Sequence, residues 1–389
     1  MAPEPTRPPS EPSGSSSALK VAIVLALLFV FLVGVKGLGD GFKLLGQDVL
    51  DSFFGATRNP FIGLAIGILA TTLVQSSSVS TSMIVGLVAS PENPLPVENA
   101  VPMIMGANIG TTVTNTVVSL AHMGRREEFR RAFAVATCHD FFNFISVAIL
   151  LPIEIATGFL RHTASNLAAF LTGFGGGQFE SPFKGAIGAG VKPIKDLVEA
   201  MIESSQAQGI ALILICGALI VFALLQLVRV MRSAMLTRVE ALVSGVLGDR
   251  IVLGMVVGAV VTVMVQSSSI TTSLLVPLAA AGLITLQQAF PITVGANIGT
   301  TVTAMLASFA VSGPNAAAGV HIALVHLLFN VSGTMLIVPI PAVRRLPLVG
   351  AEWIASVAIN SKQWALFYVL ILFYAVPGLL ALVHRMLSS

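Results

Sequence analysis

Charged residues are scarce in this sequence. Asp, Glu, Lys and Arg make up only 10% of the 389 residues, whereas hydrophobic residues make up 55% and the mean hydropathy is +0.91. Soluble domains carry about 25% charged residues, so this chain has too few to cover a water-exposed surface. The scarcity excludes a soluble enzyme and predicts a polytopic membrane protein. The net charge of +3 is also too small to suggest a nucleic-acid partner.

Cysteine is almost as scarce, and its two copies, Cys138 and Cys216, both lie in apolar segments. This placement excludes a disulfide framework and predicts buried thiols. The sequence also lacks a Gly-x-Ser-x-Gly motif, a P-loop and a cluster of metal-ligating residues. We therefore expect no enzymatic activity and no resident cofactor.

Acidic residues are missing from two apolar intervals, 62–90 and 251–309. Carboxylates inside membrane segments serve proton relays, so a proton-driven mechanism is poorly supported. The polar residues in these intervals are instead dense blocks of hydroxyl side chains, which are functional by default inside a bilayer. The blocks are Gln75-Ser76-Ser77-Ser78-Val79-Ser80-Thr81-Ser82 and Gln266-Ser267-Ser268-Ser269-Ile270-Thr271-Thr272-Ser273.

The two blocks belong to an internal repeat. Residues 106–114, Gly-Ala-Asn-Ile-Gly-Thr-Thr-Val-Thr, recur unchanged at 295–303, and the His-x-x-Phe-Asn motif of 139–143 recurs at 326–330. The offsets are 266 − 75 = 191, 295 − 106 = 189 and 326 − 139 = 187. Three motifs that recur in the same order at a nearly constant offset indicate two copies of one structural unit.

Each repeat has an interrupted hydrophobic pattern. Residues 62–74 cover only about half of the ~20 residues that a spanning helix needs, and the hydroxyl block then follows, which predicts a re-entrant helical hairpin. The glycine-containing segment predicts a break in the next helix, since glycines permit unwinding. Arginine-rich segments at 123–131, 229–250 and 342–347 predict the cytoplasmic side. The halves then run in opposite directions, as in inverted-repeat secondary transporters.

These patterns predict an all-α polytopic membrane protein with two inverted-topology repeats, each with a re-entrant helical hairpin and a broken transmembrane helix. We expect a multi-pass location in the plasma membrane, or the inner membrane in a bacterium. The expected organisation is a disordered tail (1–18), a first transmembrane helix and interfacial segment (19–59), repeat 1 (60–160), an extracytoplasmic loop (161–208), a connecting transmembrane helix and cytoplasmic loop (209–250), repeat 2 (251–343) and a C-terminal transmembrane helix (344–389).

Helix starts at Ser76 and Ser267 would each place free amide N–H groups and about half a positive charge near the midplane. Such starts bind anions, and two of them lined with hydroxyls suit a small tetrahedral oxyanion. The neutral oxygens of Asn108, Thr111 and Thr114, with freed carbonyls, suit a hard monovalent cation; Asn297 is the copy of Asn108. Gln75 and Gln266 are able to donate a hydrogen bond to an anion or to coordinate a cation through the amide oxygen. Small-residue helix packing at Gly106 and Gly110 is expected alongside coordination.

One ionisable pair, His139 and Asp140, lies inside a predicted span. The second repeat keeps His326 but replaces Asp140 with Leu327. We therefore favour a packing or hydrogen-bonding role for Asp140.

The paired Gln-Ser-Ser-Ser blocks, the paired Gly-Ala-Asn-Ile-Gly-Thr-Thr segments and Glu128-Phe129-Arg130-Arg131-Ala132-Phe133 leading into residues 139–143 resemble the type II sodium–phosphate cotransporters. The resemblance covers roughly residues 60–160 and 205–385, and the compact 161–208 interval places the chain with bacterial-like members. It implies sodium-coupled symport of inorganic phosphate by alternating access. It implies phosphate contacts at Gln75, Ser76, Ser77, Ser78, Gln266, Ser267, Ser268 and Ser269. The implied sodium positions are Gln266, Ser267, Thr300 and Thr303, with Gln75, Thr111 and Thr114 as their counterparts.

Other functions fit parts of the same pattern. An oxyanion channel would use the helix starts as a selectivity filter, and a non-transporting sensor would bind phosphate without moving it. A carrier is favoured because two hairpins that close on one site leave no continuous path for a channel. Sulfate and arsenate stay open as alternative oxyanions.

Overall fold

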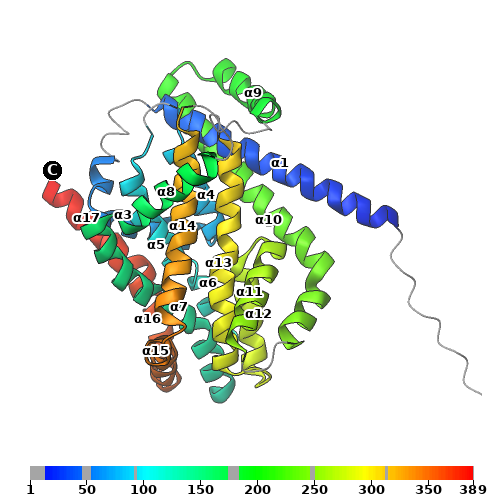
Figure 1. The fold of residues 1–389 in the computed structure, drawn as a ribbon, viewed down its shortest axis with the longest axis vertical. Helices are drawn as coiled ribbons and strands as arrows, with labels where there is room; N and C mark the ends of the chain where they lie inside the picture. Colours follow the sequence, from blue (N-terminus) through cyan, green and yellow to red (C-terminus); the bar gives the residue numbers. More distant parts are fainter. Residues whose placement is uncertain are drawn as a thin grey trace, which may run out of the picture.

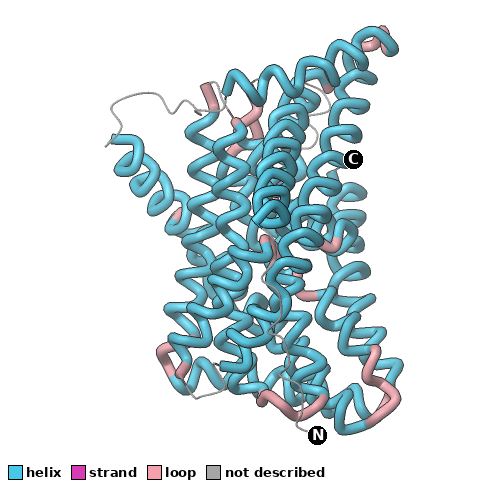
Figure 2. Tube along the Cα trace, turned by 90° about the vertical axis from the view of Figure 1, so that its right-hand side faces the viewer, coloured by secondary structure: helices cyan, strands magenta, loops and turns pink. Residues whose placement is uncertain are grey.

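The computed structural model describes residues 14–45, 54–91, 94–173, 184–245, 250–311 and 314–388, and every regular element in these ranges is a helix. Figure 2 shows an elongated bundle in which short loops join the helices. The all-α prediction is confirmed. Residues 1–13 of the predicted disordered tail lie outside the described residues, whereas residues 14–18 are helical in α1 (Gly14–Leu44), contrary to the prediction. Residues 46–53 of the predicted interfacial segment also lie outside the described residues.

Six helices in the described part are long and apolar enough to cross a membrane. Their spans are Leu19–Leu44, Arg126–Thr157, Ser205–Leu227, Leu286–Ala310, Ala316–Ile337 and Gln363–His384. The polytopic prediction is confirmed. The apolar run over residues 19–35 predicts the first span, but the observed span reaches Leu44 because α1 continues through the glycines that follow the run. Both cysteines are buried free thiols, as predicted.

Each hydroxyl block begins in the turn between two short helices and continues into the second helix, as the hairpin prediction requires. The first pair is α3 (Pro60–Val74) and α4 (Ser77–Val88), and the second is α11 (Ile251–Val265) and α12 (Ser268–Ala280). Asn59 caps α3 by accepting from the Phe61 amide at 3.0 Å, and Pro60 occupies the first position, where its missing N–H costs nothing. In Figure 1, α3 and α4 lie in the upper half of the bundle and α11 and α12 in the lower half.

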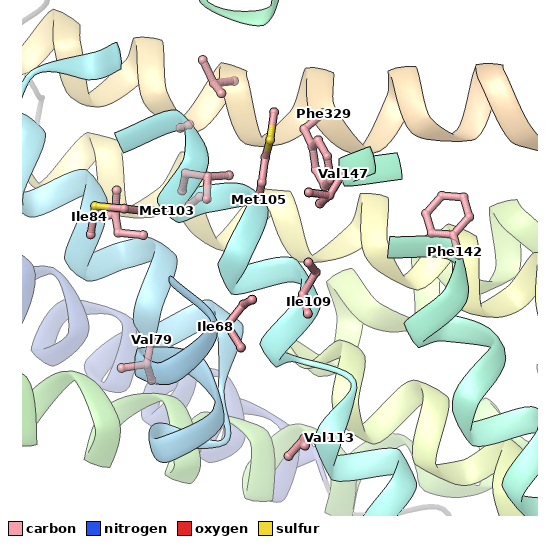
Figure 3. Packing of buried hydrophobic residues seen from close by; sticks show 14 of the residues in the cluster. Ile68, Val79, Ile84, Met103, Met105, Ile109, Val113, Phe142, Val147 and Phe329 are labelled. Carbon is pink, nitrogen blue, oxygen red and sulfur yellow. The ribbon is translucent and has the colours of Figure 1, made fainter. Parts of the chain in front are cut away.

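The prediction of a broken helix holds for the first repeat and is wrong for the second. The chain breaks after α5 (Val97–Gly110) and resumes as α6 (Val113–Leu120), and Figure 3 shows the thin connection between Ile109 and Val113. The identical segment of the second repeat lies within one continuous helix, α13 (Leu286–Ala310). Both residues of the first break, Thr111 and Thr112, keep right-handed helical angles. The break is therefore a slight one.

Close helix packing, not unwinding, accounts for the glycines of the repeated segment. A Cβ at Gly110 would lie 2.7 Å from the Ile68 carbonyl oxygen, and one at Gly299 would lie 2.6 Å from that of Ala259. Gly106 and Gly295 approach α3 and α11 more closely still. These glycines are helical, so the expected unwinding at them is wrong, whereas the small-residue packing expected alongside coordination is confirmed.

Two segments predicted as loops are largely helical. The 161–208 interval contains most of α8 (Phe159–Gly173) and all of α9 (Lys184–Met201), and the basic 229–250 segment continues α10 (Ser205–Gly245). Charged residues also occur on the polar face of an amphipathic helix, so they do not by themselves indicate a loop. The C-terminal region adds α15 (Pro341–Asn360) before a final span built from α16 (Lys362–Leu370), a π-helical turn (Ile371–Ala375) and α17 (Val376–Ser388).

The halves of the chain pack across each other. Helix α4 contacts α14 (Ala316–Ile337), and its counterpart α12 contacts α7 (Arg126–Thr157). Likewise α8 packs on α14 and α15 packs on α7, while α1 packs along α10. Figure 3 shows the core at one of these junctions, where Met105 of α5 and Val147 of α7 lie beside Phe329 of α14. The hairpins are therefore held against the opposite half.

Candidate functional site

The two hairpin tips have the same unusual backbone. Gln75 ends α3 with φ 58° and Gln266 ends α11 with φ 57°, and these are the only non-glycine residues with positive φ in the described ranges. An L-residue in the left-handed region costs on the order of 1–2 kcal/mol. Such strain is retained mainly where function requires the side chain.

Each tip glutamine is fixed by the same two hydrogen bonds. The Gln75 amide nitrogen donates to the Thr72 carbonyl at 2.5 Å, and that of Gln266 donates to the Val263 carbonyl at 2.7 Å. The amide oxygens accept from threonine hydroxyls, Gln75 from Thr114 at 3.0 Å and Gln266 from Thr303 at 3.2 Å. One amide N–H of each glutamine is committed to the helix, and each glutamine presents an oxygen, paired with a hydroxyl oxygen, at the tip.

A helix begins immediately after each glutamine. Ser76 caps α4 by accepting from the Val79 amide at 3.4 Å, and Ser267 caps α12 by accepting from the Ile270 amide at 3.3 Å. The amides of the next two residues, Ser77 and Ser78 or Ser268 and Ser269, stand at positions that have no intrahelical partner. Each tip thus places donors for an anion beside oxygens for a cation.

Helix α6 joins the two tips. Thr114, which bonds to Gln75, is followed by Asn115, a buried residue whose side-chain oxygen accepts from Thr272 at 2.9 Å and from Ser273 at 3.0 Å. Thr272 also donates to the Ser268 carbonyl at 2.8 Å in the first turn of α12. One short helix of the first repeat therefore touches both hairpins, a link that sequence reasoning missed because Asn115 is replaced by Ala304 in the second copy.

Three of the remaining predicted cation ligands hydrogen-bond within their own helices, whereas Asn297 bonds to α7. Thr111 donates to the Ala107 carbonyl at 2.8 Å and Thr300 to the Ala296 carbonyl at 3.0 Å. Asn108 donates to the Ile104 carbonyl at 2.9 Å. The structure thus brings Thr114 and Thr303 to the tips, whereas no direct contact to either tip is described for Thr111, Thr300 or Asn108.

Comparison with known proteins shows the family of the chain. The family model described as Na+/Pi-cotransporter matches residues 30–176 and 219–338. The chain belongs to this family. Sodium-dependent phosphate transport protein 2A of Mus musculus is 35% identical over 448 residues, an alignment covering 97% of this chain and 69% of that protein. Sodium-dependent phosphate transport protein 2B of Homo sapiens is 33% identical over 451 residues, covering 92% and 64%. No solved structure matches the chain.

This cotransporter-family chain also contains a buried polar network that crosses between the repeats. His139 Nε2 lies 2.5 Å from the Asn297 side-chain oxygen, and Asn297 donates to the Asn143 side chain at 2.8 Å. Asn143 in turn donates to the Asn108 carbonyl at 2.8 Å. The four-residue spacing of His139 and Asn143 places them on one helix face. That spacing was the available signal, but the partner in the other repeat was not foreseeable from it.

Asp140 is the acidic residue that this structure buries completely among the membrane helices. Its Oδ2 accepts from the Tyr368 hydroxyl at 2.7 Å, which agrees with the predicted hydrogen-bonding role. Its Oδ1 has no hydrogen-bond partner in the described part of the chain, nor does the buried hydroxyl of Thr116 on α6. Because Tyr368 belongs to the last span, this carboxylate ties the C-terminal helix to the first repeat.

Proposed function

We propose that this chain is a sodium-coupled phosphate symporter of the plasma membrane and that both ions bind between its two hairpin tips. The family assignment supports the activity. The observation that supports the location is the pair of tips, each with a left-handed glutamine, a threonine partner and a serine-capped helix start. No catalytic step is part of this function.

Phosphate would bind at the helix starts. The first amides of α4 and α12 and the hydroxyls of residues 76–78 and 267–269 supply several donors. Ser77, Ser78 and Ser268 are largely buried, and hydrogen bonds to an anion are stronger away from water. No Lys or Arg lies in 62–90 or 251–309, so the helix ends and co-bound cations would have to balance the charge of the anion.

Sodium would bind at the paired oxygens of Gln266 and Thr303, with Gln75 and Thr114 as the second such pair. A hydroxyl that donates to an amide oxygen still has lone pairs free for a cation. Both oxygens are neutral and hard, as a monovalent cation in a transporter site requires. A sodium ion bound beside the helix starts would add an electrostatic attraction for the anion, which couples the two ions.

Uptake into proteoliposomes tests the activity. Phosphate should accumulate under an inward sodium gradient and should not accumulate when potassium or choline replaces sodium. Uptake that is unchanged by the replacement would overturn sodium coupling. Competition by sulfate and arsenate, each added in tenfold excess, defines which oxyanion the carrier prefers.

Two substitutions test the location. Ser267→Ala and Thr303→Ala should each raise the sodium concentration required for half-maximal uptake. Ser356→Ala provides a matched control, because its hydroxyl is exposed and bonds only to the Trp353 carbonyl at 2.6 Å on α15. Wild-type sodium activation in both test variants would contradict the assigned cation site.

A further inference from the structure

A cleft lies at the opposite end of α11 from the hairpin tip. It has a volume of about 480 Å³ and is formed by the beginnings of α11, α13 and α15. Three arginines, Arg250, Arg344 and Arg345, line it together with one acid, Glu352. Apolar side chains complete the wall, namely Ile251, Phe290, Pro291, Leu348 and Val349. The cleft thus combines a cationic edge with an apolar interior.

The positive charge of this cleft is not neutralised by the described part of the protein. No ion pair joins any of the three arginines to an acid there, and Arg344 uses one N–H to donate to the Val338 carbonyl at 3.1 Å. Arg250 and Arg345 are exposed. Three arginines against one glutamate leave a lining charge of 3 − 1 = +2.

The corresponding place in the first repeat is built differently. There a cleft is lined by Arg58 and Glu98, and Glu98 also pairs with Arg161 at 3.0 Å. At the repeat offset of 189, Glu98 corresponds to Gln287, which lines the arginine cleft. The second repeat therefore has an amide where the first has the balancing acid. The uncompensated charge is a property of this one end and not a general requirement of the fold.

The cleft lies at the end of the bundle that the sequence assigns to the cytoplasm. A neighbouring cavity of about 320 Å³ contains Arg130 and Arg131 and shares Gln287 and Glu352 with the cleft. Arginines from all three arginine-rich segments thus lie at one end of the bundle, the end where Figure 1 shows α15. Cytoplasmic leaflets carry the anionic phospholipids, which basic pockets between membrane helices recognise.

The surroundings favour a lipid over free phosphate. Val349 in the cleft lining is 59% accessible. Val252 and Leu346, which follow the lining residues Ile251 and Arg345 in the sequence, are 69% and 54% accessible, so acyl chains have an apolar surface to lie on. Inorganic phosphate would gain nothing from such walls. Gly254 in the cleft and Gln266 at the tip are twelve positions apart along α11, a distance of about 18 Å along a helix. The cleft is therefore separate from the proposed transport site.

We propose that this cleft binds the headgroup of an anionic phospholipid, with Arg250, Arg344 and Arg345 around the lipid phosphate and the acyl chains along α11 and α15. The lipid would link the second hairpin to α15 at the membrane surface. This inference does not depend on the proposed transport function, because its measurement is lipid binding.

The test uses the purified full-length chain in detergent, with phosphatidylglycerol or phosphatidylcholine added and bound lipid counted by native mass spectrometry. Wild type should retain phosphatidylglycerol in preference to phosphatidylcholine. Each arginine near an anionic lipid is worth about fivefold in affinity, so Arg250→Gln with Arg345→Gln should weaken phosphatidylglycerol binding about thirtyfold. The doubly substituted Arg250→Lys, Arg345→Lys protein keeps the charge and should stay within a fewfold of wild type.

Two controls make the outcomes decisive. Arg58→Gln, in the corresponding cleft of the first repeat, should leave phosphatidylglycerol binding unchanged. Millimolar inorganic phosphate should not displace the lipid. Equal retention of both lipids, no loss in the double glutamine variant, an equal loss in Arg58→Gln or displacement by inorganic phosphate would each overturn the proposal.

Discussion

Replacing Gln266 by glycine separates the structural role of this residue from its proposed ion-binding role. Gln266 has φ 57°, a conformation that glycine adopts without strain. The substitution relieves on the order of 1–2 kcal/mol of backbone strain, while it removes the bond to the Val263 carbonyl and the acceptor for Thr303. A partly exposed hydrogen bond contributes about 0.5–1.5 kcal/mol. These effects nearly cancel, so the thermal stability of Gln266→Gly should stay close to that of wild type.

The effect on sodium should be much larger. Loss of an oxygen that contacts a cation removes a charge-assisted interaction of about 1.5–3 kcal/mol. This corresponds to a roughly 10- to 150-fold rise in the sodium concentration required for half-maximal activation. The assay is sodium-dependent phosphate uptake into proteoliposomes, with the melting temperature of the purified protein measured in parallel.

Gln75→Gly is the matched variant in the first repeat, since Gln75 has φ 58° and the same pair of bonds. A different sodium response in the two variants would show which tip binds the cation more strongly. If both glycine variants keep wild-type sodium activation and wild-type stability, the glutamine side chains have no part in ion binding, and the reasoning from the strained tips is refuted.

Three further substitutions test the packing and the links around the site. Gly295→Ala should lower the melting temperature by several degrees, because its Cβ would press on the Met255 carbonyl oxygen and overpacking costs typically 1–3 kcal/mol; Gly188→Ala, with open space around it, is the control, and equal melting temperatures would contradict the packing account. Asn115→Ala, which copies Ala304, should raise the phosphate KM by freeing Thr272 and Ser273 of α12, whereas an unchanged KM would mean that α6 does not position the second tip. Tyr368→Phe should destabilise the protein by about 1–3 kcal/mol because the buried Asp140 loses its hydroxyl donor, and thermal unfolding that matches wild type would show that another group replaces it.

The class of the protein and its local turning points follow from the sequence alone. Low charge and long apolar stretches require a lipid environment, and a hydroxyl block in such a stretch is a place where a helix must end and restart. The helix ends at Gln75 and Gln266 and the serine caps after them therefore lie where the pattern predicts. These features depend on contacts between residues a few positions apart, and such contacts follow from the local sequence.

Tertiary structure decided the features that depend on distant partners. Residues 106–114 and 295–303 are identical, yet the helix breaks in the first copy and continues in the second. The copies differ in the residue that follows, where Asn115 is held by α12 and Ala304 has no polar side chain. The glycines of both copies pack against a neighbouring helix and do not unwind. The bond between His139 and Asn297 joins residues 158 positions apart. Local sequence specifies where a helix is able to break and which side chains are available, but the energy of burying each polar group depends on the partner that the folded chain brings to it.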